Sequence, residues 1–297
     1  MRTAIPAWEP AEATAPDVDW AERLDRAHAV LRGRRIVALT GAGVSTASGI
    51  PDYRSPGAPR RTPMTLQQFL GSAEFRRRYW ARNHLGWRHM DSAQPNAAHR
   101  ALAGLPGVTG VITQNVDLLH LKAGSRGVID LHGNYAQVRC LSCDYRISRH
   151  RLHAQLEPLN AGFTARIAGR GALEVAPDAD VVVEDTTDFT MVDCAVCDGV
   201  LKPDIVYFGE SVPKPRVARA FAAVDDADAL LVLGTSLTVM SGLRFVRHAA
   251  KQGKPVVIVN RGRTRGDELA DVTVDVDVAT ALARLTDDRR TPTERTR

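Results

Sequence analysis

The chain has 297 residues and a formal net charge of +5, and 44% of its residues are hydrophobic while 25% are charged. This composition is that of a soluble globular protein with one large or two modest domains. Every apolar run is shorter than the roughly 20 residues of a membrane span, and residues 1–19 lack the basic start and apolar stretch of a signal peptide. We therefore expect a cytoplasmic protein. The basic residues are scattered in small groups, which favours solvated surfaces over a nucleic-acid-binding patch.

Strands and helices are expected to alternate along most of the chain. After a flexible Ala/Pro-rich leader at 1–19, helical spacing covers 20–32 and ends at Gly33. Buried strands are predicted from apolar runs at 36–39, 110–113, 128–131, 230–233, 256–259 and 272–274. Helices are expected at 65–90, 96–104, 241–252 and 278–285. This alternation predicts an α/β fold with a doubly wound parallel sheet, whose ligands bind beyond the carboxyl ends of the strands.

The expected domain boundaries lie where the alternation of strands and helices is interrupted. A discontinuous Rossmann-like domain is predicted from residues 20–56, 92–134 and 204–286. Residues 57–91 form the helical part of a small domain, and the polar, irregular segment 135–203 is inserted as a separate module. Residues 287–297 read as a disordered tail.

A glycine-containing loop at residues 40–55 follows the first predicted strand. Gly41 and Gly43 allow a sharp turn and a close backbone approach to a ligand, and caps for a short helix are available from Ser45, Thr46 and Ser48. The outline is that of a phosphate-binding loop, although Gly49 comes six residues after Gly43 and not three as in the usual dinucleotide fingerprint. An ordinary strand-to-helix turn is the alternative. The following IPDYRS has the residue mixture of a functional loop.

Two Cys-x-x-Cys pairs lie in the irregular segment, at Cys140/Cys143 and Cys194/Cys197. Four thiolates close a tetrahedral zinc shell with no position left for water, which indicates a structural metal. The 50 residues between the pairs exceed the about 15–20 of the commonest zinc ribbons. An elaborated loop is therefore expected inside the module. Unliganded buried cysteines and a redox pair are the alternatives.

Candidates for reaction chemistry follow two other strands, in the QNVD of residues 114–117 and at His132. A histidine at a strand end can take a proton near neutral pH. A lone histidine is nevertheless more often a cap or a core residue, and the residue alone does not decide between these roles.

Together, these motifs closely resemble the sirtuins, the NAD-dependent protein deacylases. The resemblance covers about residues 20–285 and rests on the glycine loop, TQNVD at 113–117, LHGN at 131–134, LKPDIVYFGE at 201–210 and GTSL at 234–237. It implies that NAD is consumed and that one structural Zn²⁺ is bound. The acyl oxygen of the substrate lysine would attack C1′ of the nicotinamide ribose. The products would be nicotinamide, free lysine and O-acyl-ADP-ribose.

The resemblance also implies residue roles. His132 would be the general base, with Asn115 and Asp117 shaping the nicotinamide pocket and the ribose contacts. The implied NAD contacts are Gly41, Ala42, Gly43, Ser45, Thr46, Asp52, Tyr53, Arg54, Gln114, Asn115, Asp117, His132, Gly234, Thr235, Ser236, Asn260, Arg261, Gly262 and Val278. The acyl-lysine peptide would lie as an added strand against Val206, Tyr207, Phe208, Gly209, Glu210 and Leu237. Residues 52–54 would close over NAD as a lid.

Within the family, residues 78–87 and the long insert between the cysteine pairs look most like class II, the lipoamidase and ADP-ribosyltransferase branch. The desuccinylase branch uses a Tyr-x-x-Arg pair, but Tyr79-x-x-Arg82 lies one helical turn early, and Asn83 and Gly86 occupy the matching positions. The two tryptophans on one helix face, Trp80 and Trp87, would favour neutral acyl groups if they line the pocket, with core packing as the alternative. Mono-ADP-ribosylation of proteins and a non-enzymatic nucleotide sensor are the alternative functions.

Overall fold

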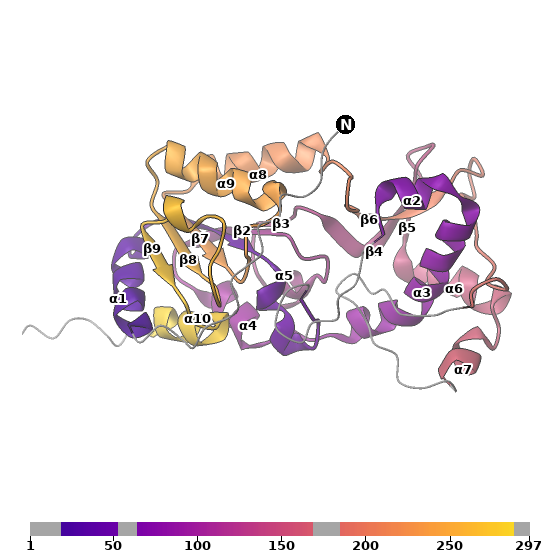
Figure 1. Cartoon of the computed structure of the whole chain (residues 1–297), viewed down its shortest axis with the longest axis horizontal. Coiled ribbons are helices and arrows are strands. Elements are labelled where there is room, and N and C mark those ends of the chain that lie inside the picture. The colour runs from indigo at the N-terminus through magenta and orange to yellow at the C-terminus, as the bar shows by residue number, and fades with distance from the viewer. Residues whose placement is uncertain (1–18, 53–63, 169–184, 288–297) are drawn as a thin grey trace, which may run out of the picture.

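The computed structural model describes residues 19–52, 64–168 and 185–287 and contains two sheets (Figure 1). The larger sheet has six parallel strands in the order β3-β2-β1-β7-β8-β9. Its strands are β1 (Ile36–Thr40), β2 (Val108–Thr113), β3 (Val128–Asp130), β7 (Ala229–Leu233), β8 (Val256–Val259) and β9 (Val272–Val274). The predicted doubly wound sheet is confirmed. Residues 1–18 of the leader expected at 1–19, and residues 288–297 of the tail expected at 287–297, lie outside the described residues.

Helices cover both faces of this sheet. Because side chains alternate along a strand, Ile36 and Ala38 pack in one core with α1 (Trp20–Leu31), α4 (Ala97–Gly104) and α10 (Val278–Thr286). Val37 and Leu39 pack in the other with α8 (Lys214–Asp226) and α9 (Met240–Lys251). Figure 1 shows α8 and α9 on one side of the strands and α4 and α10 on the other. The expected helices at 20–32, 96–104, 241–252 and 278–285 are all present within a residue or two.

A second, antiparallel sheet lies beside the first domain, with strand order β5-β4-β6. It comprises β4 (Gly133–Cys140), β5 (Arg146–Ser148) and β6 (Leu201–Ile205). Its core is shared with α2 (Leu66–Gly71), α3 (Ala73–Ser92) and α6 (Arg149–Leu159), and α7 (Phe163–Ala168) contributes two apolar side chains. The expectation that residues 135–203 are irregular was therefore wrong for most of the described part of this segment.

The remaining elements are short. They are α5 (Leu119–Lys122) and the 3-10 helices Ala42–Val44, Thr46–Ser48 and Asp267–Leu269. The strand β6 ends at Ile205, and beyond it Phe208 forms an isolated bridge with Thr65.

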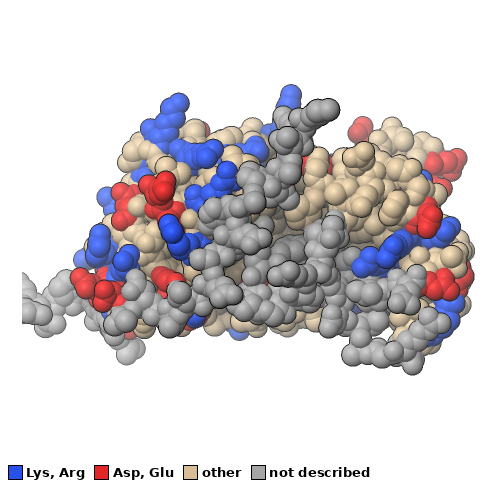
Figure 2. Space-filling view, in the orientation of Figure 1, with Lys and Arg blue, Asp and Glu red and all other residues tan. Residues whose placement is uncertain are grey.

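The surface of the six-stranded domain carries charges of both signs. Figure 2 shows Lys and Arg side chains interspersed with Asp and Glu over this half of the molecule. Among the residues that the structure describes, no helix is both long enough and apolar enough to cross a membrane.

Candidate active site

The sheet brings the predicted NAD-binding loops to one edge. The strands β1, β2 and β7 are parallel neighbours, so the loops that follow them leave the sheet on the same side. Direct backbone bonds join these loops: Gln114 N donates to Thr40 O over 2.9 Å, and Gly41 N donates to Leu233 O over 3.1 Å. The glycine loop, the QNVD segment and the turn at 234–236 therefore form one continuous surface.

Gly41 is required because the glycine loop touches the turn after β7. A Cβ on Gly41 would lie 2.6 Å from Thr235 Cβ, closer than two carbon atoms can approach. The N–H of Gly43 donates to Gly234 O over 2.9 Å. The amides of both glycines thus hold the two loops together.

Ser45 connects the glycine loop to the QNVD segment. Its hydroxyl donates to Asp117 Oδ2 over 2.6 Å and accepts from Asn115 Nδ2 over 2.9 Å. The other oxygen of Asp117 accepts from Leu119 N over 2.9 Å. Asp117 is only 3% exposed, and burial raises its carboxyl pKa, opposed by the bond from Ser45. The helix-capping role expected for Ser45 is wrong, because its side chain makes no cap bond.

Two buried histidines that sequence reasoning missed lie beneath this cluster. His99 Nδ1 accepts from Asn96 N over 3.3 Å, so the neutral ring carries its hydrogen on Nε2, which lies 3.5 Å from Ser45 Oγ. His120 Nε2 lies 2.9 Å from Thr40 Oγ1, and the two rings are 4.8 Å apart. Burial lowers the pKa of His99 to about 4 and that of His120 to about 3. Both rings are therefore neutral at neutral pH and serve as hydrogen-bonding supports.

His132 has a defined tautomer. Its Nδ1 lies 2.9 Å from Gln114 O, which can only accept, so Nδ1 carries the hydrogen and Nε2 presents a lone pair. Ser241 Oγ lies 2.8 Å from Nε2. Burial lowers the pKa of His132 to about 4, opposed by the bond to Gln114, and Arg216 and Arg244 lower it further. The ring is thus a neutral proton acceptor at neutral pH.

Three further members of the predicted NAD set belong to the same loops. Thr235 Oγ1 accepts from Gln114 Nε2 over 3.0 Å, Ser236 Oγ lies 3.0 Å from Thr238 Oγ1, and Thr46 Oγ1 donates to Gly43 O over 3.2 Å. Ala42 begins the first 3-10 helix, and Asp52 is half-buried. Tyr53 and Arg54 lie outside the described residues.

The last residues of the predicted NAD set follow β8 in the sequence. Asn260 Nδ2 donates to the carbonyls of Arg261 and Gly262, and Gly262 N donates to Asp275 Oδ1. A small cleft of about 150 Å³ is lined by Asn260 and Gly262 together with Arg23, Thr273 and Asp275. Val278 is the buried first residue of α10. The hydrogen bonds of the Asn260 side chain therefore stabilise the loop that follows β8.

The segment predicted to hold the peptide is anchored from both sides. Val206 N donates to His132 O over 2.8 Å, and Phe208 O accepts from Leu66 N over 3.0 Å. Tyr207 is buried between the rings of Phe69 and Tyr79.

Two other members of the predicted peptide site have side chains that face the protein. Glu210 pairs with Lys202 and Arg139. Leu237 is 1% exposed and has a φ of 55°, a left-handed conformation that a leucine adopts only under strong structural constraint. Contacts of Tyr207, Glu210 and Leu237 with a peptide would therefore have to run through the backbone.

The four cysteines converge at the end of the small sheet. Cys140 ends β4, Cys143 lies in the turn that follows, and Cys194 and Cys197 precede β6. Three of the distances between sulfur atoms are 3.6 Å for Cys140–Cys197, 3.7 Å for Cys143–Cys194 and 3.4 Å for Cys143–Cys197. A tetrahedron with Zn–S bonds of about 2.3 Å has edges of about 3.8 Å. The four thiolates therefore fit one structural zinc ion.

Comparison with known proteins decides the family. The sequence model of the Sir2 family matches residues 41–241. This chain belongs to the Sir2 family, the sirtuins. It is 64% identical to NAD-dependent protein deacetylase 1 of Mycobacterium avium over 88% of this chain and 93% of that protein. It is 55% identical to NAD-dependent protein deacetylase 1 of Streptomyces coelicolor over 86% of this chain and 87% of that protein.

Solved Sir2 structures have the same fold. A structure described as Sir2 with a p53 peptide and NAD⁺ superposes with a TM-score of 0.70 at 30% identity, covering 88% of this chain and 96% of that chain. A second one, described as the structural basis for the mechanism and regulation of Sir2 enzymes, has a TM-score of 0.69 at 27% identity, over 89% and 96% of the two chains.

A second group of metal-type side chains in this sirtuin does not fit a metal. Ligand atoms of His84, His153 and Glu157 lie within 4.8 Å of one another. However, Trp87 Nε1 donates to His153 Nδ1, so the neutral ring carries its hydrogen on Nε2. A guanidinium nitrogen of Arg88 also lies 2.7 Å from that Nε2. The hydrogen on His153 Nε2 and the positive charge of Arg88 thus occupy the position where a metal ion would bind.

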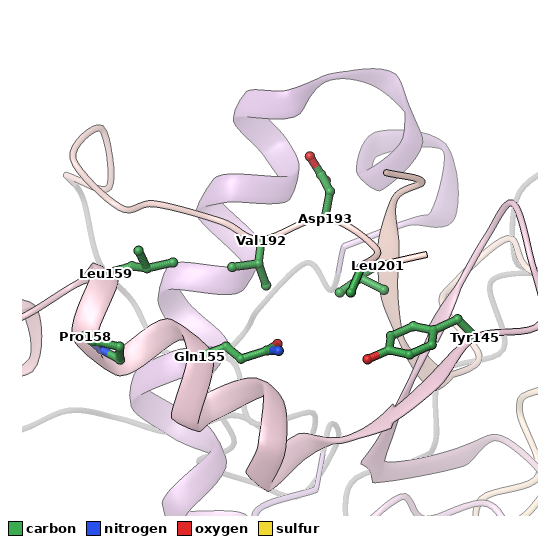
Figure 3. A pocket seen from close by; sticks show the side chains of 8 residues that line it. Tyr145, Gln155, Pro158, Leu159, Val192, Asp193 and Leu201 are labelled. Carbon is green, nitrogen blue, oxygen red and sulfur yellow. The ribbon is translucent and has the colours of Figure 1, made fainter. Parts of the chain in front are cut away.

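A hollow of about 370 Å³ lies in the zinc-binding part of this sirtuin, away from the predicted NAD contacts. Tyr145 and Gln155 extend their polar ends toward each other across it, and Leu201 and Val192 contribute apolar surface (Figure 3). It contains none of the residues that the family resemblance implicates in binding NAD or peptide. We assign it no part in the reaction.

Proposed function

We propose that this protein is an NAD-dependent protein lysine deacylase that removes acetyl and related acyl groups. The observation that carries the proposal is the arrangement of His132. Its Nε2 lone pair is held at the loop edge, in the same loop cluster as Ser45, Asn115 and Asp117. Support also comes from the relatives in Mycobacterium avium and Streptomyces coelicolor, which are named NAD-dependent protein deacetylases.

We assign the residues the following parts. The loops after β1, β2 and β7 bind NAD, with Asn115 and Asp117 at the nicotinamide ribose, and the loop after β8 takes the adenosine half. The acyl-lysine peptide lies against the backbone of residues 206–210 and the turn at Leu237. His132 removes a ribose hydroxyl proton after nicotinamide has left, and the four-cysteine zinc site stabilises the small sheet without entering the reaction.

The general-base assignment is tested with His132→Ala. Deacetylation of an acetyl-lysine peptide, followed by mass spectrometry, should fall by about 10²–10⁴-fold, while NAD binding, measured by calorimetry, should persist. His28→Ala, which removes a half-buried histidine on α1, should remain as active as the wild type. Near-normal turnover of His132→Ala would remove this residue from the mechanism.

Mono-ADP-ribosylation is the competing reaction at the same site. With NAD labelled in the adenine half, a deacylase leaves the label on a small soluble product, whereas a transferase leaves it on protein. We expect the label in O-acyl-ADP-ribose, together with free lysine. Label retained on protein without peptide deacylation would overturn the proposed function.

The finer assignments are proposals of the same kind. We place the chain in class II of the family on residues 78–87 and the long insert between the cysteine pairs. We also place it in the cytoplasm, with acyl-lysine proteins as its partners. A panel of acyl-lysine peptides bearing acetyl, octanoyl, lipoyl and succinyl groups would assign the acyl preference.

A further inference from the structure

The hydroxyl of Ser241 is directed at the reactive nitrogen of His132. Ser241 lies in the first turn of α9, is 8% exposed, and places its Oγ 2.8 Å from His132 Nε2. Because Gln114 O takes the hydrogen on Nδ1, Nε2 must be the acceptor and the Ser241 hydroxyl the donor. The ring is therefore held between a carbonyl on one side and a hydroxyl on the other.

The packing of α9 makes this contact possible. The residue after Ser241 is Gly242, and a Cβ there would lie 2.8 Å from Gln114 Oε1. The missing side chain lets the first turn of α9 approach the loop that also supports His132. The hydroxyl is also not needed for helix capping, because the N-cap of α9 is Val239 and makes no side-chain cap bond. The hydroxyl instead forms its hydrogen bond with the histidine.

We infer that Ser241 is a positioning residue for the general base, an inference that rests on the proposed function of His132. In the free protein its hydroxyl donates to Nε2 and fixes the ring orientation. During deacylation the ribose hydroxyl replaces Ser241 as the donor to the one lone pair of Nε2. The ribose O–H bond then breaks and an Nε2–H bond forms, while the ribose oxygen bonds to the imidate carbon and the π pair of its C=N bond moves to the lysine nitrogen. The new imidazolium then needs an acceptor. The Ser241 hydroxyl can rotate about its Cβ–Oγ bond and accept from Nε2–H until the proton passes to solvent, because a hydroxyl both donates and accepts.

The kinetic test separates the two halves of the reaction. Release of nicotinamide precedes the action of His132, so exchange of labelled nicotinamide into NAD reports the first half alone. Ser241→Ala should lower kcat for acetyl-lysine deacetylation about tenfold, the effect of one charge-assisted hydrogen bond. Nicotinamide exchange and the KM for NAD should stay within about twofold, and Ser241→Thr, which restores a hydroxyl, should recover most of kcat. Ser92→Ala, which removes an exposed hydroxyl at the end of α3, is the matched control.

A second measurement does not depend on catalysis. In ¹⁵N spectra of the histidine rings, loss of the donated hydrogen bond in Ser241→Ala should shift the Nε2 resonance of His132 away from the range of a protonated nitrogen, and Ser241→Thr should reverse the shift. This readout remains valid if the wild-type protein deacylates no peptide, a result that would reject the proposed function and leave the contact itself measurable. The inference is overturned by an unchanged Nε2 resonance, by deacetylation that is unchanged or faster in Ser241→Ala, or by equal losses in deacetylation and exchange.

Discussion

The ammonium of Lys202 lies 2.9 Å from Glu210 Oε2, and the lysine side chain has no exposed surface. The ammonium also donates to Pro203 O over 3.2 Å, and the same Glu210 oxygen accepts from Tyr207 N over 2.9 Å. Burial lowers the pKa of Lys202, and the Glu210 charge opposes this effect. The pair therefore ties β6 to the segment that is proposed to hold the peptide.

Removing one charge of this pair should lower the free energy of unfolding and leave the KM for the peptide nearly unchanged. Glu210→Gln leaves the Lys202 charge buried and uncompensated, so we expect the free energy of unfolding in urea to fall by about 3–5 kcal/mol. Asp188→Asn, which breaks the exposed pair with Arg166, should cost no more than about 1 kcal/mol. The KM for the peptide should change little at a temperature where the variant is folded. A large rise in KM at unchanged stability would instead make the Glu210 carboxylate a direct peptide ligand.

His84 should make the protein sensitive to acid. Its ring is 2% exposed and packs against His153 and Phe189 at 4.7 Å and 5.4 Å. Neither nitrogen makes a hydrogen bond among the described residues, and the nearest carboxylate oxygen, Oε2 of the half-exposed Glu157, lies 3.4 Å from Nε2. Burial lowers the pKa of His84 to about 3, and His153 and Arg149 lower it further. In the unfolded chain His84 has a pKa near 6.5, so below that pH the unfolded chain binds a proton at His84 that the folded chain does not bind. Stability therefore falls as the pH falls from about 6.5.

The variant His84→Phe isolates this contribution. Between pH 7.5 and pH 5.0, one such histidine should lower the free energy of unfolding by about 2 kcal/mol. His84→Phe, which keeps an aromatic ring in an aromatic site, should lose about that much less than the wild type over the same interval. His89→Gln, at an exposed position on α3, should follow the wild-type curve. If both variants lose stability as the wild type does, then His84 does not titrate on unfolding.

Zinc should act on folding and not on chemistry. Cys194 is 1% exposed and its sulfur lies 3.7 Å from that of Cys143. Cys194→Ser should lower the bound zinc below one ion per chain, and it should lower the melting temperature, because a structural zinc site contributes folding free energy directly. At a temperature where the variant stays folded, the KM for NAD should be close to that of the wild type. Metal-free protein with an unchanged melting temperature and activity would contradict the four-thiolate site.

The elements that could be predicted from the sequence are those whose residue types agree with their burial: buried elements made of apolar residues. The strands β1, β7 and β8 are buried at every position, so they appear as continuous apolar runs. In contrast, β5 has the pattern exposed, buried, exposed and only three residues, and α6 begins with a buried arginine, Arg149. A charged residue normally indicates surface, so both elements were missed.

The candidate site shows the same division. Motif residues such as His132 and Asp117 could be proposed because they follow strands and lie in motifs that resemble those of the sirtuins. Ser241 and His99 could not, since their partners in the site lie 109 and 54 residues away along the chain. Only the folded sheet brings these residues together. One local signal existed for His99, its position three residues after the helix-capping Asn96.

The two tryptophans on α3 should support the fold without choosing the acyl group. The guanidinium of Arg149, itself 1% exposed, lies 5.7 Å from the ring centre of Trp80 and 4.9 Å from that of Trp87. Trp87 Nε1 donates to His153 Nδ1 over 3.1 Å, and Arg149 Nε donates to Asn83 Oδ1 over 3.0 Å. Both rings are 4% exposed. The alternative of core packing is therefore favoured over an acyl-pocket lining.

Trp87→Leu tests this assignment, because it removes a cation–π contact and a buried hydrogen bond together. We expect the free energy of unfolding to fall by about 3–5 kcal/mol. The ratio of kcat/KM for octanoyl- and acetyl-lysine peptides should remain within about twofold of the wild-type ratio. Succinyl-lysine should be a poor substrate of both proteins, because Asn83 and Gly86 occupy the positions that match the Tyr-x-x-Arg pair of the desuccinylase branch, and neither can pair with an acidic acyl group. A selective loss of octanoyl-lysine cleavage in Trp87→Leu would show that Trp87 lines the acyl pocket. If succinyl-lysine were cleaved faster than every neutral acyl-lysine, and Arg82→Met abolished that cleavage, then Tyr79 and Arg82 would reach the acyl group despite their one-turn offset.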